Sequence, residues 1–222
     1  MNKLSHVAFI MDGNGRWGIK KKKTRNFGHL NGVETVKKIV EASIKLEIPV
    51  VTFYVFSTEN WKRPKTEITF LFNLISSYFK KEIDQIMKNQ IKINIIGETK
   101  KLPKRLIKIL KTSVRKTKSN KKILVNLAVN YGSKKEIINS VNRIRANKSI
   151  NENSLTKNLY TYGIPNPDIL IRTGGQKRLS NFMLWQLAYA EIYFIDKLWP
   201  DFSIKDLKKI INNYKNIQRN FG

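Results

Sequence analysis

The segment 11–17, M-D-G-N-G-R-W, holds the most informative group of reactive side chains in the sequence. The apolar run from Val7 to Met11 is typical of a buried strand, which would deliver the Asp12 carboxylate at its carboxyl end. The glycines leave backbone N–H groups open beside this carboxylate, and Arg16 adds a guanidinium, and both groups suit phosphate oxygens. Mg²⁺ is usually held by one or two carboxylates plus substrate phosphates. The segment therefore predicts a Mg²⁺–diphosphate site at the end of a strand.

This segment has two other interpretations. A strand followed by an Asx-Gly turn needs no ligand at all, and the residues alone leave that reading open. Nucleotide binding is the second, because residues 13–18 match G-x-G-x-x-G after a strand. The third glycine of that fingerprint should open a helix with an apolar face, but Gly18 leads into Ile19 and four lysines. The context therefore disfavours a nucleotide site.

A second cluster follows the next apolar run, at residues 57–64, S-T-E-N-W-K-R-P. Beside a diphosphate, Arg63 would pair with phosphate, and Ser57 and Asn60 would align the substrate or relay a proton. Trp61 offers a flat apolar face to a hydrocarbon. A polar loop that ends at a proline, with the tryptophan covering the core, explains the same residues.

A third cluster lies at residues 171–181, I-R-T-G-G-Q-K-R-L-S-N. Arg172 and Arg178 flank a Gly-Gly pair, an arrangement typical of an oxyanion clamp, although a basic surface turn is the alternative. The strongly apolar run 182–190 then ends at Glu191. A carboxylate there needs a partner if it is buried, so it is either a surface residue or a second Mg²⁺ ligand.

Arg25 and His29 follow the lysine run that begins at Lys20. Arg25 would reach a phosphate and His29 would donate a hydrogen bond to it. Taken on its own, His29 fits a residue at the start of a helix better than a functional group.

Short apolar runs alternate with longer segments of helical periodicity, which predicts one α/β domain over residues 1–222. We expect a mostly parallel central sheet of about six strands with helices on both faces. Ligands of such sheets bind beyond the carboxyl ends of the strands, where the three clusters stand. The predicted strands are 5–11, 50–56, 91–96, 122–129, 168–172 and 191–194. The predicted helices are 29–46, 67–89, 103–117, 134–146 and 203–217.

Composition narrows the class of protein. The apolar content of 41% and aromatic content of 10% are typical of a globular chain. No apolar run reaches the roughly 20 residues that span a bilayer, and no signal peptide is recognisable. The chain has no cysteine and only two histidines, which excludes disulfides and thiol catalysis and disfavours Zn²⁺. These features predict a cytoplasmic protein.

The net charge of +27 does not by itself distinguish between classes of partner. It suits nucleic acid, an anionic membrane surface or anionic substrates. However, the lysines are spread through the chain together with abundant Ile and Asn, a pattern that general compositional bias also produces.

The motifs, taken in order, resemble the cis-prenyltransferases, and among them the bacterial undecaprenyl diphosphate synthases (isoprenyl transferases). The resemblance covers essentially the whole chain. The matching blocks are M-D-G-N-G-R-W at 11–17, R-x-F-G-H at 25–29, F-S-T-E-N-W-x-R-P at 56–64, N-Y-G at 130–132, P-D-I-L-I-R-T-G-G at 167–175, R-L-S-N-F-x-L-W-Q-x-A-Y-A-E-x-Y-F at 178–194 and L-W-P-D-F at 198–202.

The resemblance implies a Mg²⁺-dependent enzyme that adds isopentenyl diphosphate repeatedly to farnesyl diphosphate with cis geometry. The product would be a long polyprenyl diphosphate, undecaprenyl diphosphate in particular, the carrier-lipid precursor for cell-wall synthesis. Asp12 is implied to be the essential metal-linked carboxylate, with Glu191 completing the Mg²⁺ site and Asn60 as proton acceptor. An amide is a poor base, so the diphosphate itself stays open as the acceptor. A homodimer is also implied.

The resemblance also assigns the remaining site residues, by their positions in the matching motifs. Those implied to hold the allylic diphosphate are Gly13, Asn14, Gly15, Arg16, Arg25 and His29. Those implied to line the prenyl entrance or the substrate loop are Trp17, Trp61, Ser57, Thr58, Glu59 and Arg63. Those implied to bind the diphosphate of isopentenyl diphosphate are Arg172, Arg178, Leu179 and Ser180. The residues available for an apolar tunnel are Val33, Val36, Val55 and 68–75, although ordinary core packing explains any one of them.

The chain departs from the family pattern at four places. Gln176 and Lys177 replace a Glu-containing pair, which puts one auxiliary contact in doubt. The arginine soon after the third strand is Lys101 here, and N-Y-G-G-R has become N-Y-G-S-K at 130–134. The C-terminal R-x-G element reads N-F-G at 220–222, with Arg219 one position early. In the family this element reaches the partner's active site, so isopentenyl diphosphate binding would be weaker or depend on Arg219.

Two other functions compete with this one. A nucleic-acid-binding protein would use the +27 charge, but the chain has no recognised binding motif and no aromatic–basic repeat. A non-catalytic subunit of a prenyltransferase pair is disfavoured by the intact set of Asp12, Asn60, Arg172, Arg178 and Glu191. Peripheral contact with the inner face of the membrane is compatible with a lipid product. No nucleic-acid partner is expected.

Overall fold

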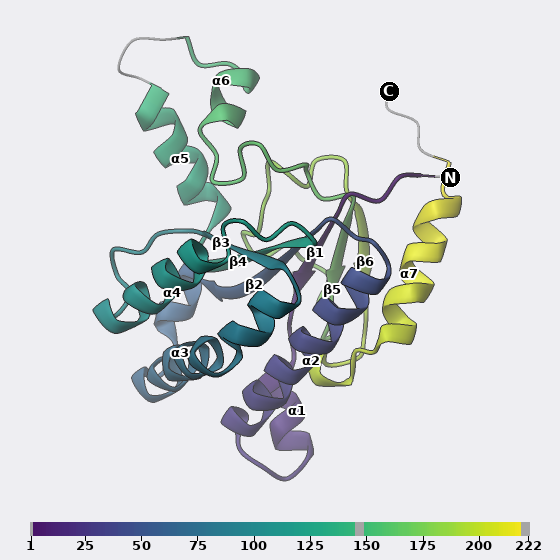
Figure 1. The fold of residues 1–222 in the computed structure, drawn as a ribbon. Helices are drawn as coiled ribbons and strands as arrows, with labels where there is room; N and C mark the ends of the chain where they lie inside the picture. The colour runs from purple at the N-terminus through teal and green to yellow at the C-terminus, as the bar shows by residue number, and fades with distance from the viewer. Residues whose placement is uncertain (1, 145–148, 219–222) are drawn as a thin grey trace.

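A six-stranded parallel sheet forms the centre of the protein (Figure 1). The computed structural model describes residues 2–144 and 149–218. The strand order is β3-β4-β2-β1-β5-β6, and every neighbouring pair runs parallel. The strands are β1 (His6–Ile10), β2 (Val50–Ser57), β3 (Ile91–Ile96), β4 (Ile123–Tyr131), β5 (Ile169–Arg172) and β6 (Glu191–Phe194). All six strands predicted from the sequence, and their parallel arrangement, are confirmed.

The central strands are apolar along their length because both faces of the sheet are covered. All five residues of β1 are buried. Val7 is in register with Val51 of β2 on one side and with Ile169 of β5 on the other. Such near-continuous apolar runs are expected for parallel strands buried on both faces.

Each of the five predicted helices is present within a few residues of its expected bounds. α2 begins four residues earlier than predicted, because the Thr24 hydroxyl caps it by accepting a hydrogen bond from the Phe27 N–H at 3.2 Å. The helices are α1 (Asn14–Lys20), α2 (Arg25–Lys45), α3 (Lys65–Lys88), α4 (Lys104–Lys116), α5 (Ser133–Ile144), α6 (Glu152–Lys157) and α7 (Ile204–Asn216). Two 3₁₀ turns, η1 (Thr58–Lys62) and η2 (Trp199–Asp201), complete the set.

The helices α1 and α6 were not predicted. α1 has no apolar stripe to reveal it, and it is held by close packing against α2 (Figure 1). A Cβ on Gly28 would lie 1.8 Å from the carbonyl oxygen of Asn14, so only glycine lets the two helices approach this closely. α6 is a short helix capped by Asn151, which accepts a hydrogen bond from the Ser154 N–H.

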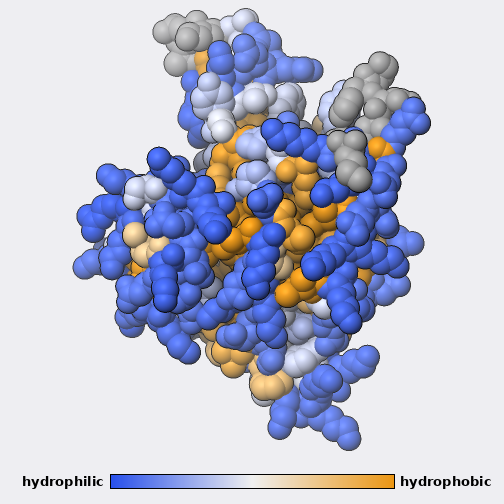
Figure 2. All heavy atoms as spheres, turned by 45° about the vertical axis from the view of Figure 1, so that its right-hand side comes forward, coloured by the Kyte–Doolittle hydropathy of each residue, from blue (hydrophilic) through white to orange (hydrophobic). Residues whose placement is uncertain are grey.

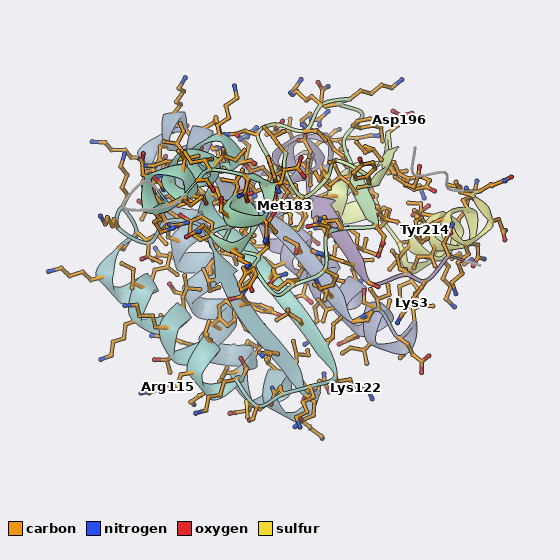
Figure 3. All side chains as sticks on the ribbon, turned by 90° about the horizontal axis from the view of Figure 1, so that it is seen from above. Lys3, Arg115, Lys122, Met183, Asp196 and Tyr214 are labelled. Carbon is orange, nitrogen blue, oxygen red and sulfur yellow. The ribbon has the colours of Figure 1, made fainter. Side chains whose placement is uncertain are left out.

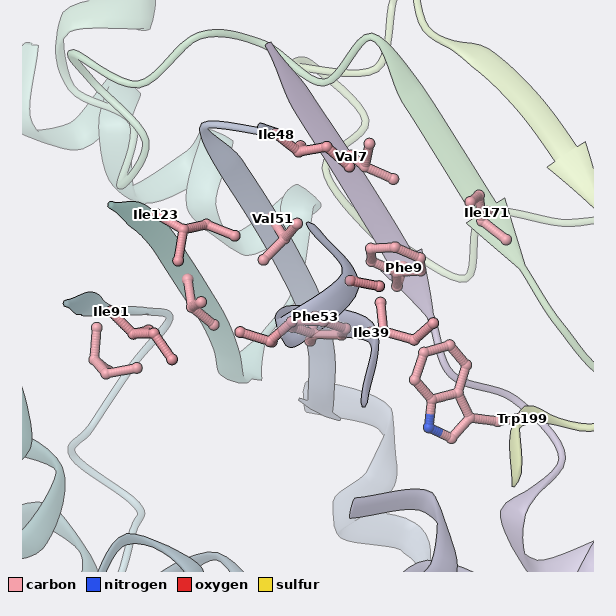
Figure 4. Packing of buried hydrophobic residues seen from close by; sticks show 14 of the residues in the cluster. Val7, Phe9, Ile39, Ile48, Val51, Phe53, Ile91, Ile123, Ile171 and Trp199 are labelled. Carbon is pink, nitrogen blue, oxygen red and sulfur yellow. The ribbon is translucent and has the colours of Figure 1, made fainter. Parts of the chain in front are cut away.

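The larger part of the core lies between the sheet and α2, α3, α4 and α7. An aromatic group stands at its centre, where the ring of Phe9 stacks on that of Phe53 at 5.0 Å and Trp199 meets both edge-on (Figure 4). The opposite face carries a second cluster, which includes Ile10, Leu170 and Phe182. There the irregular segment 179–190 covers much of the sheet, and α5 and α6 project beyond it in Figure 1.

A row of buried polar side chains crosses this second face. His6 Nε2 lies 2.7 Å from the Thr52 hydroxyl, which accepts a hydrogen bond from the Asn126 amide at 3.0 Å. Asn126 in turn accepts one from Asn94 at 2.9 Å. The other ring nitrogen of His6 donates to the Pro165 carbonyl at 2.7 Å. Burial lowers the pKa of His6 to about 4, so the ring is neutral near pH 7.

Charged side chains dominate the outside of the molecule. Figure 2 shows hydrophilic residues over most of one face, with apolar ones visible between them. Within residues 2–144 and 149–218, no helix is both long and apolar enough to cross a membrane.

Candidate active site

The carboxyl ends of β1, β2 and β5 meet around a pocket of about 500 Å³. It forms because these strands are neighbours in the sheet, and each ends in one of the clusters found in the sequence. The predicted site residues that line it are Asp12, Gly13, Asn14, Gly15, Arg16, Arg25, His29, Ser57, Asn60, Arg63, Arg172, Arg178 and Ser180. The structure thus brings together eleven predicted residues from the three clusters with Arg25 and His29.

The Asp12 carboxylate stands between two arginines. Its Oδ1 lies 3.2 Å from Arg16 Nη2, and its Oδ2 lies 2.9 Å from Arg172 Nη2. Arg16 also donates to the Gly174 carbonyl at 2.8 Å, which fixes its direction. The chain turns into α1 at Gly13, whose φ of 108° is accessible to glycine and strained for other residues.

Arg172 is the buried base of the pocket. It is only 3% exposed, and one terminal nitrogen donates to the Ser180 hydroxyl at 2.7 Å and to the Arg178 carbonyl. Its Nε has no hydrogen-bond partner among the described residues, nor does the buried side-chain oxygen of Asn14. A buried guanidinium needs anionic partners, and Asp12 supplies one carboxylate only. The arrangement can therefore hold a further anion.

A second group of charges is organised by Glu67, which the sequence analysis missed. Glu67 Oε2 lies 3.1 Å from Arg25 Nε, and Oε1 lies 3.1 Å from Arg63 Nη1 and 3.4 Å from His29 Nε2. Burial alone would raise the pKa of Glu67, but the hydrogen bond from Arg25 and the charge of Arg63 outweigh it and lower that pKa. The spacing of four residues after Arg63 was the signal available in the sequence.

His29 is uncharged near neutral pH. Burial lowers its pKa, and the positive charge of Arg63 lowers it further, while Glu67 only partly opposes both effects. His29 can therefore offer a neutral N–H to an anion.

The turn after β2 holds Asn60 at the pocket wall. Asn60 Oδ1 accepts a hydrogen bond from the Ser57 N–H at 3.2 Å and so caps η1. Tyr54 stands beside this turn, and burial raises the pKa of its hydroxyl, which donates to the carbonyls of Tyr131 and Ser180. The side chains around the pocket are thus fixed by hydrogen bonds before any ligand binds.

An apolar cavity of about 120 Å³ adjoins the polar pocket. It runs between α2 and α3, and the two spaces share Met11, Asn14, His29, Val55 and Leu71 as lining residues. The other residues around the cavity are Gly32, Val33, Val36, Leu74, Ile75, Tyr78, Phe79, Leu127, Val129 and Trp199. The arrangement can hold an anionic head group and an apolar chain side by side.

Comparison with known proteins decides the family. The family model described as putative undecaprenyl diphosphate synthase matches residues 10–222. The chain is 46% identical to an isoprenyl transferase of Prochlorococcus marinus, covering 98% of this chain and 83% of the relative. It is 44% identical to an isoprenyl transferase of Fusobacterium nucleatum, covering 98% and 95%. The chain belongs to the cis-prenyltransferase family.

Two solved structures agree. Lavandulyl diphosphate synthase from Lavandula x intermedia, in complex with dimethylallyl diphosphate, has a TM-score of 0.94 and 32% identity, with 97% of each chain covered. A probable undecaprenyl diphosphate synthase from Campylobacter jejuni has a TM-score of 0.86 and 36% identity, with 99% of each chain covered. The protein is thus an enzyme of prenyl-chain elongation with the fold of the cis-prenyltransferases.

Some residues implied by the family lie outside this pocket. Trp17 stacks on Phe27 at 5.8 Å and donates to Asp201 at 2.7 Å. Trp61 donates to Asn130 at 2.7 Å and packs edge-on against Phe56. Neither tryptophan is among the residues that line the pocket or the cavity.

Three further residues lie behind the pocket wall. Thr58 donates to Glu59, and Glu59 also accepts a hydrogen bond from Asn181 at 2.8 Å. Burial by itself would raise the pKa of Glu59, but the hydrogen bonds from Asn181 and its neighbours lower it. Leu179 packs on the apolar cluster of the second face, together with Phe182. Their contribution to substrate binding remains a prediction.

Within one chain, Glu191 does not reach the pocket. It begins β6 opposite Ile169, whereas Arg172 stands at the other end of β5. Three residues of strand separate these levels, roughly 10 Å. Glu191 can therefore fill the predicted role at a Mg²⁺ site only together with groups that lie outside this pocket.

The departures from the cis-prenyltransferase pattern have local consequences. Gln176 Oε1 accepts a hydrogen bond from Arg178 Nη1 at 2.8 Å, so a neutral amide holds the arginine where the family has a carboxylate. The backbone N–H of Lys134 donates to the Asn181 side chain, and Lys101 is exposed. Residues 219–222, which include Arg219, lie outside the described residues.

The donor set at Asp12 suits a hard cation that a diphosphate also ligates. Among the described residues, no group of three or more His, Asp or Glu side chains is placed to hold a metal ion by itself. Mg²⁺ is commonly bound through one or two carboxylates with substrate phosphates and water as the other ligands. One partly exposed carboxylate among phosphate-binding arginines fits that requirement.

Proposed function

We propose that the enzyme condenses isopentenyl diphosphate repeatedly onto farnesyl diphosphate with cis geometry, in a Mg²⁺-dependent reaction. The product would be a long polyprenyl diphosphate, undecaprenyl diphosphate by analogy with the family. The observation that carries this proposal is the junction of a pocket lined by five arginines and Asp12 with an apolar cavity. A substrate with an anionic head and an apolar tail matches both spaces at once.

In the proposed mechanism, two groups of cations hold the two diphosphates. Arg25 and Arg63, aligned by Glu67, bind the allylic diphosphate together with neutral His29. Arg172 and Arg178 bind the diphosphate of isopentenyl diphosphate, and the Ser180 hydroxyl adds a hydrogen bond. The known complex of lavandulyl diphosphate synthase with dimethylallyl diphosphate supports an allylic diphosphate as a ligand of this fold.

Asp12 is the residue that would hold Mg²⁺, which supplies neutralisation of the charge on the departing diphosphate. Arg16 would stabilise the same charge from its fixed position beside the Gly174 carbonyl. As the new carbon–carbon bond forms, the condensed intermediate loses one proton. Asn60 lines the pocket and is one candidate acceptor, and the released diphosphate is the other.

We further propose that the enzyme is a homodimer joined along β6. β6 is the last strand of the sheet, and its flanks carry exposed apolar side chains, with Tyr189 73% and Ile192 39% exposed. A second copy on this edge would lie next to Glu191, which would give that residue access to a site shared between subunits. We expect Ile192→Glu to shift the protein towards monomer in analytical ultracentrifugation, with the exposed Ile138→Glu as control; an unchanged dimer would refute this edge.

The test of the main proposal is direct. Purified protein is incubated with farnesyl diphosphate, labelled isopentenyl diphosphate and Mg²⁺, and the extracted lipid is sized. A ladder that ends near eleven isoprene units is expected. A shorter end point would keep the reaction and change the product. Folded protein that incorporates no label would refute the reaction and reopen the non-catalytic-subunit hypothesis.

A further inference from the structure

A stretch without any acidic residue stands out in the charge distribution. Between Glu98 and Glu136 the chain has thirteen Lys and Arg residues and no Asp or Glu. The rest of the chain holds thirty Lys and Arg together with all sixteen acidic residues. The positive charge is therefore not uniform along the sequence.

Eleven of these cations form one surface, which we name the α4 surface. All eleven are exposed. Six lie on α4, which turns Leu106, Leu110 and Ser113 towards the core, and five lie in the segments that flank it. Among the described residues, none of the eleven makes a salt bridge. They are Lys100, Lys101, Lys104, Arg105, Lys108, Lys111, Arg115, Lys116, Lys118, Lys121 and Lys122.

Part of the α4 surface is a shallow groove. The groove is lined by four of the cations, by Thr112 and by the half-buried Ile107. Figure 3 shows Arg115 and Lys122 along one edge of the molecule and Asp196 near the opposite edge. The groove shares no lining residue with the diphosphate pocket. The α4 surface is therefore separate from the diphosphate pocket.

Like charges this close repel one another, because their spacing along the helix is shorter than the Debye length of about 8 Å in physiological salt. An anionic partner that covers the surface relieves this repulsion and releases its own counterions. The α4 surface is thus complementary to an extended negative surface rather than to a single carboxylate.

The chemistry of the surface favours a lipid bilayer over nucleic acid. Residues 98–130 contain no Phe, Trp or Tyr on which a base could stack. Nine of the eleven cations are lysines, which act as point charges and not as planar forks that read phosphates or base edges. Clusters of four to eight such residues are typical of segments that bind anionic lipid head groups.

The position of α4 relates this surface to the proposed product. α4 packs against α3, and α3 lines the apolar cavity on its other side. A bilayer against α4 would lie one helix away from the space proposed for the growing chain. We infer that the α4 surface is where the enzyme docks on an anionic membrane; the biological sense of this docking rests on the proposed function.

The test uses vesicles of phosphatidylcholine with about a third phosphatidylglycerol, against phosphatidylcholine alone. The variant is Lys104→Gln, Lys108→Gln, Lys111→Gln and Arg115→Gln combined. The control removes four charges elsewhere, with Lys205→Gln, Lys208→Gln, Lys209→Gln and Lys215→Gln on exposed positions of α7. Circular dichroism and label incorporation in detergent check that both variants are folded and active.

We expect wild type and the α7 control to bind anionic vesicles with similar affinity, and the α4 variant to bind up to roughly a thousandfold more weakly. Equal losses in the two variants would overturn the inference, since total charge alone would then explain binding. Tight binding of a duplex DNA oligonucleotide with the same dependence on α4 would also overturn it in favour of nucleic acid. Vesicle binding without label incorporation would refute the proposed reaction and leave the docking surface standing.

Discussion

The polar pocket and the apolar cavity share a wall but differ in how well they are prepared for a ligand. The pocket measures about 500 Å³, and its arginines are already held by Asp12, Glu67 and backbone carbonyls. The cavity measures about 120 Å³, well below the roughly 300–1,000 Å³ of ordinary small-molecule sites. The pocket proposed for the head group is thus already ordered by these contacts, and we expect a long chain to need more space between α2 and α3 than the cavity offers.

We expect the largest effect on activity from a substitution of Asp12, which pairs with two arginines of the pocket. We expect Asp12→Ala to lower kcat/KM by about 10³-fold or more, because it removes the carboxylate proposed to hold Mg²⁺ and leaves Arg172 buried without its carboxylate partner. Label incorporation at increasing Mg²⁺ measures this. Asp84→Ala, at an exposed carboxylate of α3 that lines neither the pocket nor the cavity, is the control. Activity within tenfold of wild type would show that Asp12 does not hold the metal.

Glu67 tests whether preorganisation matters apart from direct contact. Glu67→Gln keeps the size of the side chain but loses the charge that aligns Arg25 and Arg63. We expect kcat/KM for farnesyl diphosphate to fall about 10–100-fold, since a small misplacement of a positioning group has this effect. The matched control is Glu98→Gln, which breaks an ion pair with Lys135 outside the pocket. Equal activity of the two variants would argue against the alignment.

The pH dependence of the free energy of unfolding tests the sheet, which contains His6, independently of the pocket. The pKa of His6 is lowered from 6.5 to about 4, so the unfolded chain binds a proton on this residue that the folded protein does not. Stability is therefore fully present above pH 6.5 and is lost as the pH falls towards 4. We expect the free energy of unfolding to drop by about 2 kcal/mol from this residue between pH 7 and pH 5.

Urea unfolding at the two pH values checks this expectation. His6→Gln, which cannot titrate, should show a smaller drop than wild type over the same interval. Identical drops in the two proteins would mean that His6 does not carry the pH dependence.

The smallest effects concern the cavity, and they sharpen its contrast with the pocket. Tyr78 lies on α3 one turn before Glu82, whose carboxylate is 2.8 Å from Lys37 Nζ on α2. We expect Tyr78→Ala to lengthen the product by one or a few isoprene units, because it enlarges the space between the helices. Tyr162→Ala, at a site 60% exposed, should leave the length unchanged.

Glu82→Gln removes the ion pair that joins α2 to α3. We expect a broader range of product lengths, with a change in stability below about 1 kcal/mol because the pair is partly solvated. Chromatography of the labelled lipids measures both variants. Product lengths identical to wild type in both would show that the space between α2 and α3 does not hold the chain.

Most of the fold and much of the candidate site could be predicted from local patterns in the sequence. The six strands were predictable because buried parallel strands are uninterrupted apolar runs, and clusters such as 171–181 stand directly after them. α1 was not predictable, because it has no apolar stripe and depends on the contact of Gly28 with Asn14. The role of Glu67 was not predictable for a similar reason, because its partners Arg25 and His29 lie some forty residues earlier in the chain.

The sequence by itself determined that the protein is a parallel α/β enzyme with Asp12 and its arginines at strand ends. Hydrophobic periodicity, composition and motifs can all be read along the chain without knowledge of the tertiary structure. The tertiary structure alone decided which charges meet and how much space they leave. It paired Asp12 with Arg172, which lies 160 residues away, and it set Glu191 three residues down the sheet from the pocket. Such distances depend on strand order and register, and no local stretch of sequence specifies these.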